Sequence, residues 1–347
     1  MKSRLRASEE YERVWSEVGS LVDRQISDGN TDVTSILSEM LVGPTKRFLS
    51  GRRFRHYYRK VGIHLDQDAQ PVERIAVRDG AYRVVPFGGF SDEQVITTLV
   101  DFLAAHGDDF DCVVELGSGT GRNLFALFHA ARKRFSNEIE WHACELTEAG
   151  RKISETLHGL CPDMNLSIHP FDYHNPDLSF LQSGRNVLFF TVHSIEQITE
   201  LSPALFDLML TRSAKCSCCH FEPVGWQFDE HLRERRRQQD ARAQRMSRSL
   251  TRRLRKVGRA LDIVFKTRFD LGFPGIDLTR NDIGRSHRVS RNAAAWSARA
   301  EYNTNIVSLL DGLEADARIT IEREDLNVYG INPFNATSII QWSKKTG

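Results

Sequence analysis

Apolar residues in the middle of this chain occur in short continuous runs that alternate with segments of helical spacing. The run VLFF at 187–190 is typical of a strand in a parallel sheet covered on both faces, whereas Leu124, Leu127 and Phe128 repeat as on a helix. Strands are expected in DCVVEL (111–116), EIEWHACEL (138–146), MNLSIHP (164–170), VLFF (187–190) and SAKCSCCHFEP (213–223). Strands separated by helices predict an α/β fold with a doubly wound, mostly parallel sheet.

The C-terminal part of the chain has a different pattern. Residues 292–317 have helical spacing, and residues 318–325 and 335–345 predict two strands joined across 326–334. The sequence therefore predicts that an antiparallel strand pair completes the sheet.

The strongest chemical signal is the turn after the first strand, where ELGSGTGRN places glycines at 117, 119 and 121. Glycine lets a ligand approach the backbone, and the free N–H groups of the following helix face that ligand. The third glycine of the dinucleotide fingerprint would stand at Arg122, so the pattern is E-x-G-x-G-x-G instead. It resembles the first motif of class I S-adenosylmethionine-dependent methyltransferases, a Rossmann-like superfamily. An ordinary glycine-rich turn is the alternative.

The resemblance implies a site for S-adenosylmethionine, with S-adenosylhomocysteine as the product, beyond the carboxyl ends of the strands. Glu145 ends the second strand and would hold the ribose hydroxyls. Asp172 would accept from the adenine amino group, although an acid before Asn-Pro is also a turn signal. The cofactor residues that the resemblance implies are Glu115, Gly117, Ser118, Gly119, Gly121, Glu145, Asp172, Tyr173 and Thr191.

Two strand ends carry the candidate catalytic residues. His193 follows the fourth strand, and a neutral imidazole can take a proton from a hydroxyl or an ammonium group near pH 7. His220 and Glu222 end the fifth strand and are expected at the same edge, where Glu222 would bind the acceptor and Trp226 would form an apolar wall. Because alignment alone contributes much to a displacement reaction, His193 is either a base or a positioning group.

The cysteines of KCSCCHFEP (215–223) raise the question of a metal site. In a strand, however, Cys216 and Cys218 point to one face and Cys219 to the other. A structural zinc site normally uses paired C-x-x-C ligands, which this chain lacks, so no metal is expected. The six cysteines are expected to be reduced thiols.

The resemblance covers about 91–226 and 293–345, which divides the chain into four parts. These are an N-terminal helical region over the acceptor pocket (1–90), the cofactor-binding core (91–226), a basic, largely helical insertion (227–292) and a C-terminal helix with the strand pair (293–347). Helices are predicted at Glu9–Ile26, at Thr31–Leu41 and after an N-cap at Ser91.

The formal charge of +1 hides an uneven distribution, because residues 231–259 contain twelve Arg or Lys and two acids. This segment favours an anionic partner, and Arg235, Arg236, Arg237, Arg252 and Arg253 are its candidate phosphate contacts. The sequence has no apolar run of the roughly 18 residues that a membrane span needs and begins with charged residues, so a cytoplasmic protein is expected.

Together these features predict a methyltransferase that acts on an oxygen or nitrogen of a small molecule or glycan. If this acceptor carries an anionic group, the basic segment would help to bind it. A nucleic-acid methyltransferase that uses the basic segment and a non-catalytic cofactor-binding scaffold are the alternatives.

Overall fold

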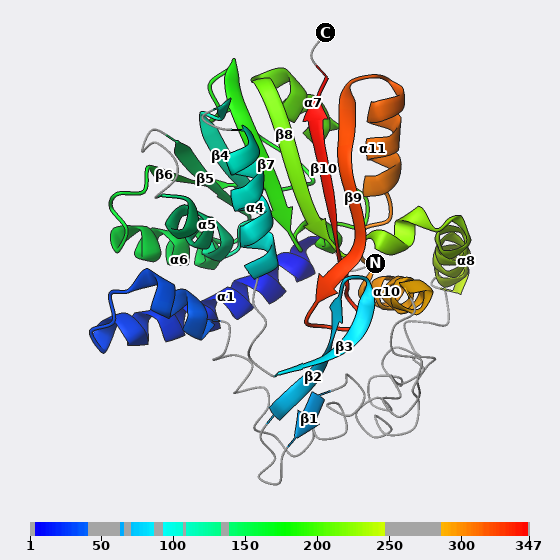
Figure 1. Ribbon diagram of the computed structural model, residues 1–347, viewed down its shortest axis with the longest axis horizontal. Coiled ribbons are helices and arrows are strands. Elements are labelled where there is room, and N and C mark those ends of the chain that lie inside the picture. Colours follow the sequence, from blue (N-terminus) through cyan, green and yellow to red (C-terminus); the bar gives the residue numbers. More distant parts are fainter. Residues whose placement is uncertain are drawn as a thin grey trace.

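The computed structural model describes residues 4–40, 63–65, 71–86, 93–106, 109–132, 139–246 and 286–345 of the 347-residue chain. Their strands form one mixed sheet through the centre of the molecule (Figure 1). The strands are β1 (Ile63–Leu65), β2 (Pro71–Arg78), β3 (Ala81–Pro86), β4 (Cys112–Leu116), β5 (Glu140–Glu145), β6 (Leu166–Pro170), β7 (Arg185–Val192), β8 (Ser213–Glu222), β9 (Ile319–Gly330) and β10 (Thr337–Lys344). Their order is β1-β2-β9-β10-β8-β7-β4-β5-β6, with β3 paired to β2.

The strands from β4 to β8 form a parallel core. The chain runs from β4 outward to β6 and then returns through β7 to β8, so the strand order reverses beside β4. This core has the order of a doubly wound sheet, in which ligands bind where the order reverses. The prediction of a mostly parallel sheet holds only for this core, because β1, β2, β3, β9 and β10 pair antiparallel and make the whole sheet mixed. β10 inserts between β8 and β9 and is antiparallel to both, which confirms the predicted C-terminal strand pair.

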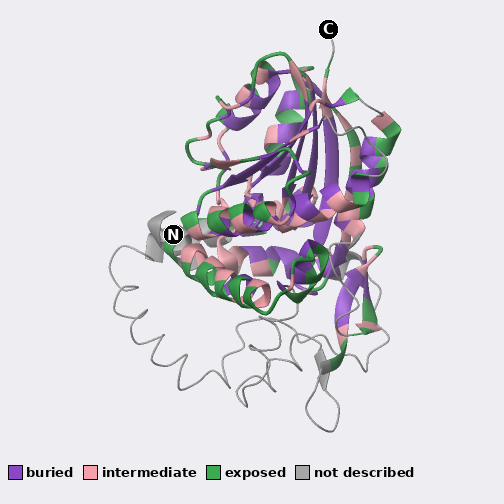
Figure 2. Ribbon diagram, turned by 90° about the vertical axis from the view of Figure 1, so that its left-hand side faces the viewer, coloured by how far each residue is buried: buried purple, intermediate pink, exposed green. Residues whose placement is uncertain are grey.

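Helices cover both faces of the sheet, whose buried strands are seen between them in Figure 2. One face packs against α1 (Arg4–Ser27), a helix at 33–40, α4 (Glu93–His106), α5 (Arg122–Ala131) and α6 (Glu148–Gly159). The other face packs against α7 (Ala204–Arg212) and α11 (Ile306–Ala315). The 3₁₀ turns η3 (Ile195–Gln197) and η4 (Gly225–Phe228) follow β7 and β8, and α8 (Glu230–Met246) packs against α10 (Ser286–Ala300).

The N-terminal region is not only helical, which corrects the prediction for residues 1–90. The two predicted helices are confirmed in α1 and the helix at 33–40, but β1, β2 and β3 extend the sheet beyond β9. The hairpin between β2 and β3 turns at Asp79 and Gly80, which have positive φ values of 50° and 71°. An Asp-Gly pair between alternating apolar residues is a strong hairpin signal, so these strands had a signature in the sequence.

The predicted helix at 292–317 is also corrected, because α10 and α11 are separate helices. Oδ1 of Asn303 accepts the N–H groups of Asn305 and Ile306 and so starts the second helix. Several predicted features, namely the cap at Ser91 and the basic segment beyond Met246 with Arg252 and Arg253, lie outside the described residues. Among the described helices, none has the length and apolar character needed to cross a membrane.

Candidate functional site

The glycine turn connects β4 to α5, and its three glycines have left-handed backbone conformations. The φ angle is 72° at Gly117, 57° at Gly119 and 74° at Gly121, which costs other residues roughly 1–2 kcal/mol. A β-carbon at Gly117 would lie 2.4 Å from Cβ of Ser194, and one at Gly119 would lie 3.0 Å from the ring of Trp15. Both the backbone conformation and the available space therefore require glycine.

Glu145, the last residue of β5, is bonded directly to this turn. Its Oε2 accepts the N–H of Gly119 at 2.9 Å, and its Oε1 accepts the N–H and the hydroxyl of Thr147 at 2.8 and 2.6 Å. Burial raises the pKa of this carboxyl, while the hydrogen bonds from Thr147 and Gly119 lower it. Since a carboxylate accepts about four hydrogen bonds, Oε2 retains an acceptor position that fits a ligand hydroxyl.

Ser118 and Glu115 lie at the start of the same turn. The N–H of Ser118 donates to the carbonyl of Cys144 at 2.9 Å, which fixes the turn against β5. The Oγ of Ser118 is buried and has no hydrogen-bond partner among the described residues, so it fits a polar ligand atom. Oε1 of Glu115 accepts from Nδ2 of Asn123 at 2.8 Å and thereby ties β4 to α5.

The other three implied cofactor residues, Asp172, Tyr173 and Thr191, differ in how far they are buried. Asp172 is half-buried just after β6, and its Oδ1 accepts the N–H of His174 at 2.9 Å. Tyr173 is buried, and its hydroxyl donates to the carbonyl of Leu116 at 2.8 Å, so it supports the glycine turn. Thr191 is buried within β7, where its side chain lies away from solvent. Asp172 is therefore the residue of these three that retains access to a ligand.

His193 follows β7 directly and has a positive φ of 53°. This conformation is uncommon outside glycine and often marks a functional position. Its Nδ1 lies 3.3 Å from Oε2 of Glu196, its Nε2 lies 2.7 Å from Oγ1 of Thr337, and its side chain is 35% exposed. Glu196 therefore orients the ring of His193. The sequence analysis did not identify Glu196, although a carboxylate three residues after a candidate histidine is a signal that could have pointed to it.

Glu222 does not project toward an acceptor, which corrects its predicted position. The side chain is fully buried, and its oxygens accept the N–H groups of Ser194, Ile195 and Glu196, each at 3.1 Å. Burial, followed by the charge of Glu196, raises the pKa of Glu222 to about 7. The residue thus holds in place the turn that follows His193.

His220 is also inside the core instead of at the ligand edge. Nε1 of Trp342 donates to its Nε2 at 3.0 Å, and its Nδ1 lies 3.1 Å from Oγ1 of Thr191. Burial lowers the pKa of His220 to about 3, so the ring is neutral. Trp226, the predicted apolar wall, is buried as well, with the guanidinium of Arg236 5.7 Å from its ring centre.

Two residues of α1 contact the site, and no sequence pattern had singled them out. The carboxylate of Glu12 accepts the N–H groups of Glu148 and Ala149 at 3.0 and 2.9 Å, at the N-terminus of α6, where negative charge is favourable. Trp15 lies against Gly119. In Figure 1, α1 crosses the molecule at the end of the sheet where the arrows of β7 and β8 terminate. Residues 12 and 15 therefore fasten α1 beside the glycine turn.

The six cysteines are buried free thiols. Cys216 and Cys218 lie in the core on one face of the sheet and Cys219 in the core on the other, which confirms the predicted separation. Among the described residues, the donor atoms that come together as in a metal site belong to a different group, Cys112, Glu140 and His142.

Comparisons with solved structures found methyltransferases. An O-methyltransferase from Bacillus cereus in complex with SAH is 13% identical over 75% of this chain and 84% of its own, with a TM-score of 0.38. A SAM-dependent methyltransferase from Aquifex aeolicus is 11% identical over 74% of this chain and 100% of its own, with a TM-score of 0.36. The DszA carbon methyltransferase is 15% identical over 38% of this chain and 35% of its own, with a TM-score of 0.30.

No protein-family profile matches the chain, and a search of curated protein sequences gave no match. Its own strands form a doubly wound α/β core, and the glycine turn follows β4, beside which the strand order reverses.

Proposed function

We propose that this chain is a class I S-adenosylmethionine-dependent methyltransferase that acts on an oxygen or nitrogen atom of a small molecule or glycan. The observation that carries the proposal is the hydrogen bond from Gly119 to Glu145, which joins a left-handed glycine turn to the acid of the neighbouring strand. This pair lies where the strand order reverses, as a nucleoside-binding site requires. Arg122 in place of a third fingerprint glycine and the inserted β10 favour a methyltransferase over a dinucleotide-dependent dehydrogenase.

The residues of this edge fit S-adenosylmethionine. Glu145 would accept from the ribose hydroxyls, and Ser118 would bind a polar atom of the amino-acid part. Asp172 would accept from the adenine amino group, and Leu146, which is 40% exposed although apolar, offers a surface to the ring. When bound, the cofactor supplies a methyl group on a positively charged sulfur.

His193 is the proposed catalytic residue. An acceptor hydroxyl or amine that replaces Thr337 as the partner of Nε2 would give its proton to a ring whose Nδ1 already faces Glu196. Glu196 would then stabilise the charged imidazole, and Glu222 would keep both residues in position through the backbone of 194–196. His220 has no part in this scheme because it is enclosed in the core.

The nucleic-acid alternative depends on the basic segment. In α8, Arg235 and Arg237 are exposed, but Arg236 donates to Oγ of Ser297 at 2.8 Å and is buried. One of the described candidate phosphate contacts is thus used to join α8 to α10, which favours the small acceptor.

Calorimetry with S-adenosylhomocysteine tests the proposal. The full chain is expected to bind it in a one-to-one ratio and to give no heat with NAD, whereas preference for NAD would overturn the assignment. Release of S-adenosylhomocysteine from S-adenosylmethionine, screened over hydroxyl, amine, glycan and RNA acceptors, then identifies the substrate class. Tight cofactor binding with no turnover on any acceptor class would favour the scaffold alternative.

A further inference from the structure

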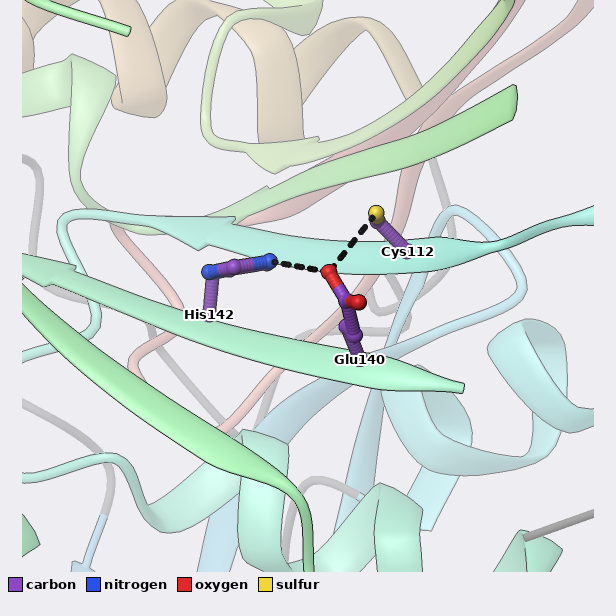
Figure 3. A group of neighbouring side chains, drawn as sticks. All are labelled: Cys112, Glu140 and His142. Carbon is purple, nitrogen blue, oxygen red and sulfur yellow. Dashed lines mark hydrogen bonds and ion pairs between the residues drawn. The ribbon is translucent and has the colours of Figure 1, made fainter. Parts of the chain in front are cut away.

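The amino ends of β4 and β5 bring together three side chains with different metal-binding donors. Cys112 begins β4 and pairs with Glu140, the first residue of β5, while His142 lies two residues further along β5. Figure 3 shows the thiol and the imidazole on either side of the Glu140 carboxylate. This group lies at the amino ends of the two strands, whereas the glycine turn lies at their carboxyl ends. It does not take part in the proposed methyl transfer.

The distances within the group fit a small tetrahedral ion. Sγ of Cys112 and Nε2 of His142 each lie 3.8 Å from Oε2 of Glu140, and all three donor atoms lie within 4.8 Å of one another. Zinc bonds of about 2.0–2.3 Å in a tetrahedron place neighbouring ligand atoms about 3.5 Å apart. The two distances to Oε2 of Glu140 are therefore about 0.3 Å longer than this spacing, and the distance between the thiol and the imidazole nitrogen is at most 4.8 Å.

His142 supplies a second, independent indication of a ligand. The residue is only 6% exposed, and its Nε2 is buried without a hydrogen-bond partner among the described residues. Its Nδ1 lies 3.1 Å from Nε2 of His169, whose ring stacks on Phe180 at 3.8 Å between centroids. When Nδ1–H donates to His169, the Nε2 lone pair faces the Glu140 carboxylate, an unfavourable pairing that a cation between them would relieve. A partner on the other ring nitrogen is usual for a histidine that binds metal.

Arg185 sets the charge and the orientation of the carboxylate. One of its guanidinium nitrogens lies 3.0 Å from Oε1 of Glu140, which leaves Oε2 directed at the cysteine and the histidine. Asp111 lies 3.8 Å from the same guanidinium and offsets its positive charge. The Glu140 side chain is 38% exposed, so solvent reaches one side of the group.

We propose that Cys112, Glu140 and His142 form a zinc site, with water as the fourth ligand on the exposed side. Thiolate, imidazole and carboxylate together are a donor set that zinc accepts. The ion would join the amino ends of β4 and β5, and the thiol proton of Cys112 would be released to solvent when zinc binds. This proposal departs from the sequence prediction that the chain holds no metal, although it leaves the cluster at Cys216, Cys218 and Cys219 without one.

Cobalt(II) provides a spectroscopic test with the intact chain. The protein is freed of metal with a chelator and titrated with cobalt(II), which gives a thiolate charge-transfer band in the near-ultraviolet when sulfur is a ligand. We expect one equivalent of cobalt to produce this band and one equivalent of zinc to abolish it. A titration of wild-type protein without the band would overturn the proposal.

Matched substitutions identify the ligands. Cys112→Ser should remove the band, whereas Cys216→Ser, at an equally buried thiol in β8, should leave it unchanged. Glu140→Gln, on the partly exposed residue, should keep the band but weaken zinc binding at least tenfold and reduce the rise in melting temperature that zinc gives to wild type. A band that persists in Cys112→Ser, or zinc affinity unaltered by Glu140→Gln, would place the metal elsewhere. Each variant is also tested for binding of S-adenosylhomocysteine. This second measurement shows whether the proposed function holds, independently of whether the metal site exists.

Discussion

The two ends of β5 carry acids with opposite surroundings. At the carboxyl end, Glu145 is held by the backbone of the glycine turn and by Thr147. At the amino end, Glu140 is held by side chains, with Arg185 on one oxygen and the thiol of Cys112 facing the other. Backbone donors keep one geometry while a ligand comes and goes, whereas side-chain donors can rearrange around an ion. The first end therefore suits a dissociable cofactor, and the second suits a resident metal.

The largest effect is expected from His193, because it is the group proposed to contact the reacting atoms at the carboxyl end. Once an acceptor is known, His193→Gln should lower kcat by about 10²–10⁴-fold, the usual contribution of a general base. His174→Gln, at an exposed histidine near the same edge, is the matched control and should leave kcat unchanged. Affinity for S-adenosylhomocysteine should survive in both variants. A kcat within threefold of wild type for His193→Gln would limit this residue to positioning the acceptor.

The two ends of the sheet should also differ in their tolerance of side chains at left-handed glycines. Gly117→Ala adds a collision with Ser194 to the conformational strain and should reduce the free energy of unfolding by about 2–5 kcal/mol. Gly184, before β7 at the amino end, has a φ of 84° and no atom within 4 Å of an added β-carbon. Gly184→Ala should therefore cost only about 1–2 kcal/mol. Urea denaturation of both variants measures the difference, and equal losses would contradict the tight contact at Gly117.

Separate substitutions of Glu145 and Glu140 test whether the two ends of β5 have different roles. Glu145→Ala should weaken binding of S-adenosylhomocysteine by about 1–3 kcal/mol, since the ribose loses a charged acceptor. Glu140→Ala should leave this affinity within twofold of wild type, because residue 140 lies at the other end of the strand. Calorimetry on both variants gives the answer. Loss of cofactor affinity in the Glu140 variant would show that the two ends are coupled.

The strands of the parallel core could be predicted from the sequence because each is determined by residues that are close together in the chain. Buried runs such as 187–190 and the glycines after β4 constrain the backbone wherever they occur. The positions of His220 and Glu222 could not be predicted in this way. Whether a strand end is open or enclosed depends on β10, which follows in sequence by more than a hundred residues and places Trp342 on His220. The contacts of α1 likewise depend on its docking against α6.

The burial of Glu222 predicts a pH dependence of stability. Its folded pKa of about 7 lies above the ordinary value of 4.5, so the unfolded state releases the proton at lower pH. The stability that this group contributes is present below about pH 4.5 and is lost as the pH rises to about 7. Glu222→Gln should therefore remove on the order of 3 kcal/mol of the pH dependence in this window. Urea denaturation across this range, with circular dichroism to confirm folding, measures it, and equal pH slopes in the two proteins would contradict the assignment.

The smallest effect is expected on the exposed face of α8. Arg235 and Arg237 are exposed, and Arg237 forms a surface ion pair with Glu234 at 3.5 Å. The double substitution Arg235→Ala and Arg237→Ala should change the free energy of unfolding by no more than about 0.5 kcal/mol, since such pairs contribute little.

The same double variant tests the nucleic-acid alternative. If α8 gripped phosphates, RNA affinity would fall steeply with salt, with a slope near −0.7 per contact for a single strand, and the variant would lower that slope by about 1.4. We expect instead weak RNA association that disappears near about 150 mM salt and does not distinguish the variant from wild type. Arg236 is excluded from the substitution because its bonds to Ser297 and Tyr302 join α8 to α10 and to the loop that follows α10, so its loss would report on packing. Micromolar binding of an RNA at that salt concentration, abolished in the double variant while S-adenosylhomocysteine still binds, would establish α8 as part of a nucleic-acid surface and displace the small acceptor.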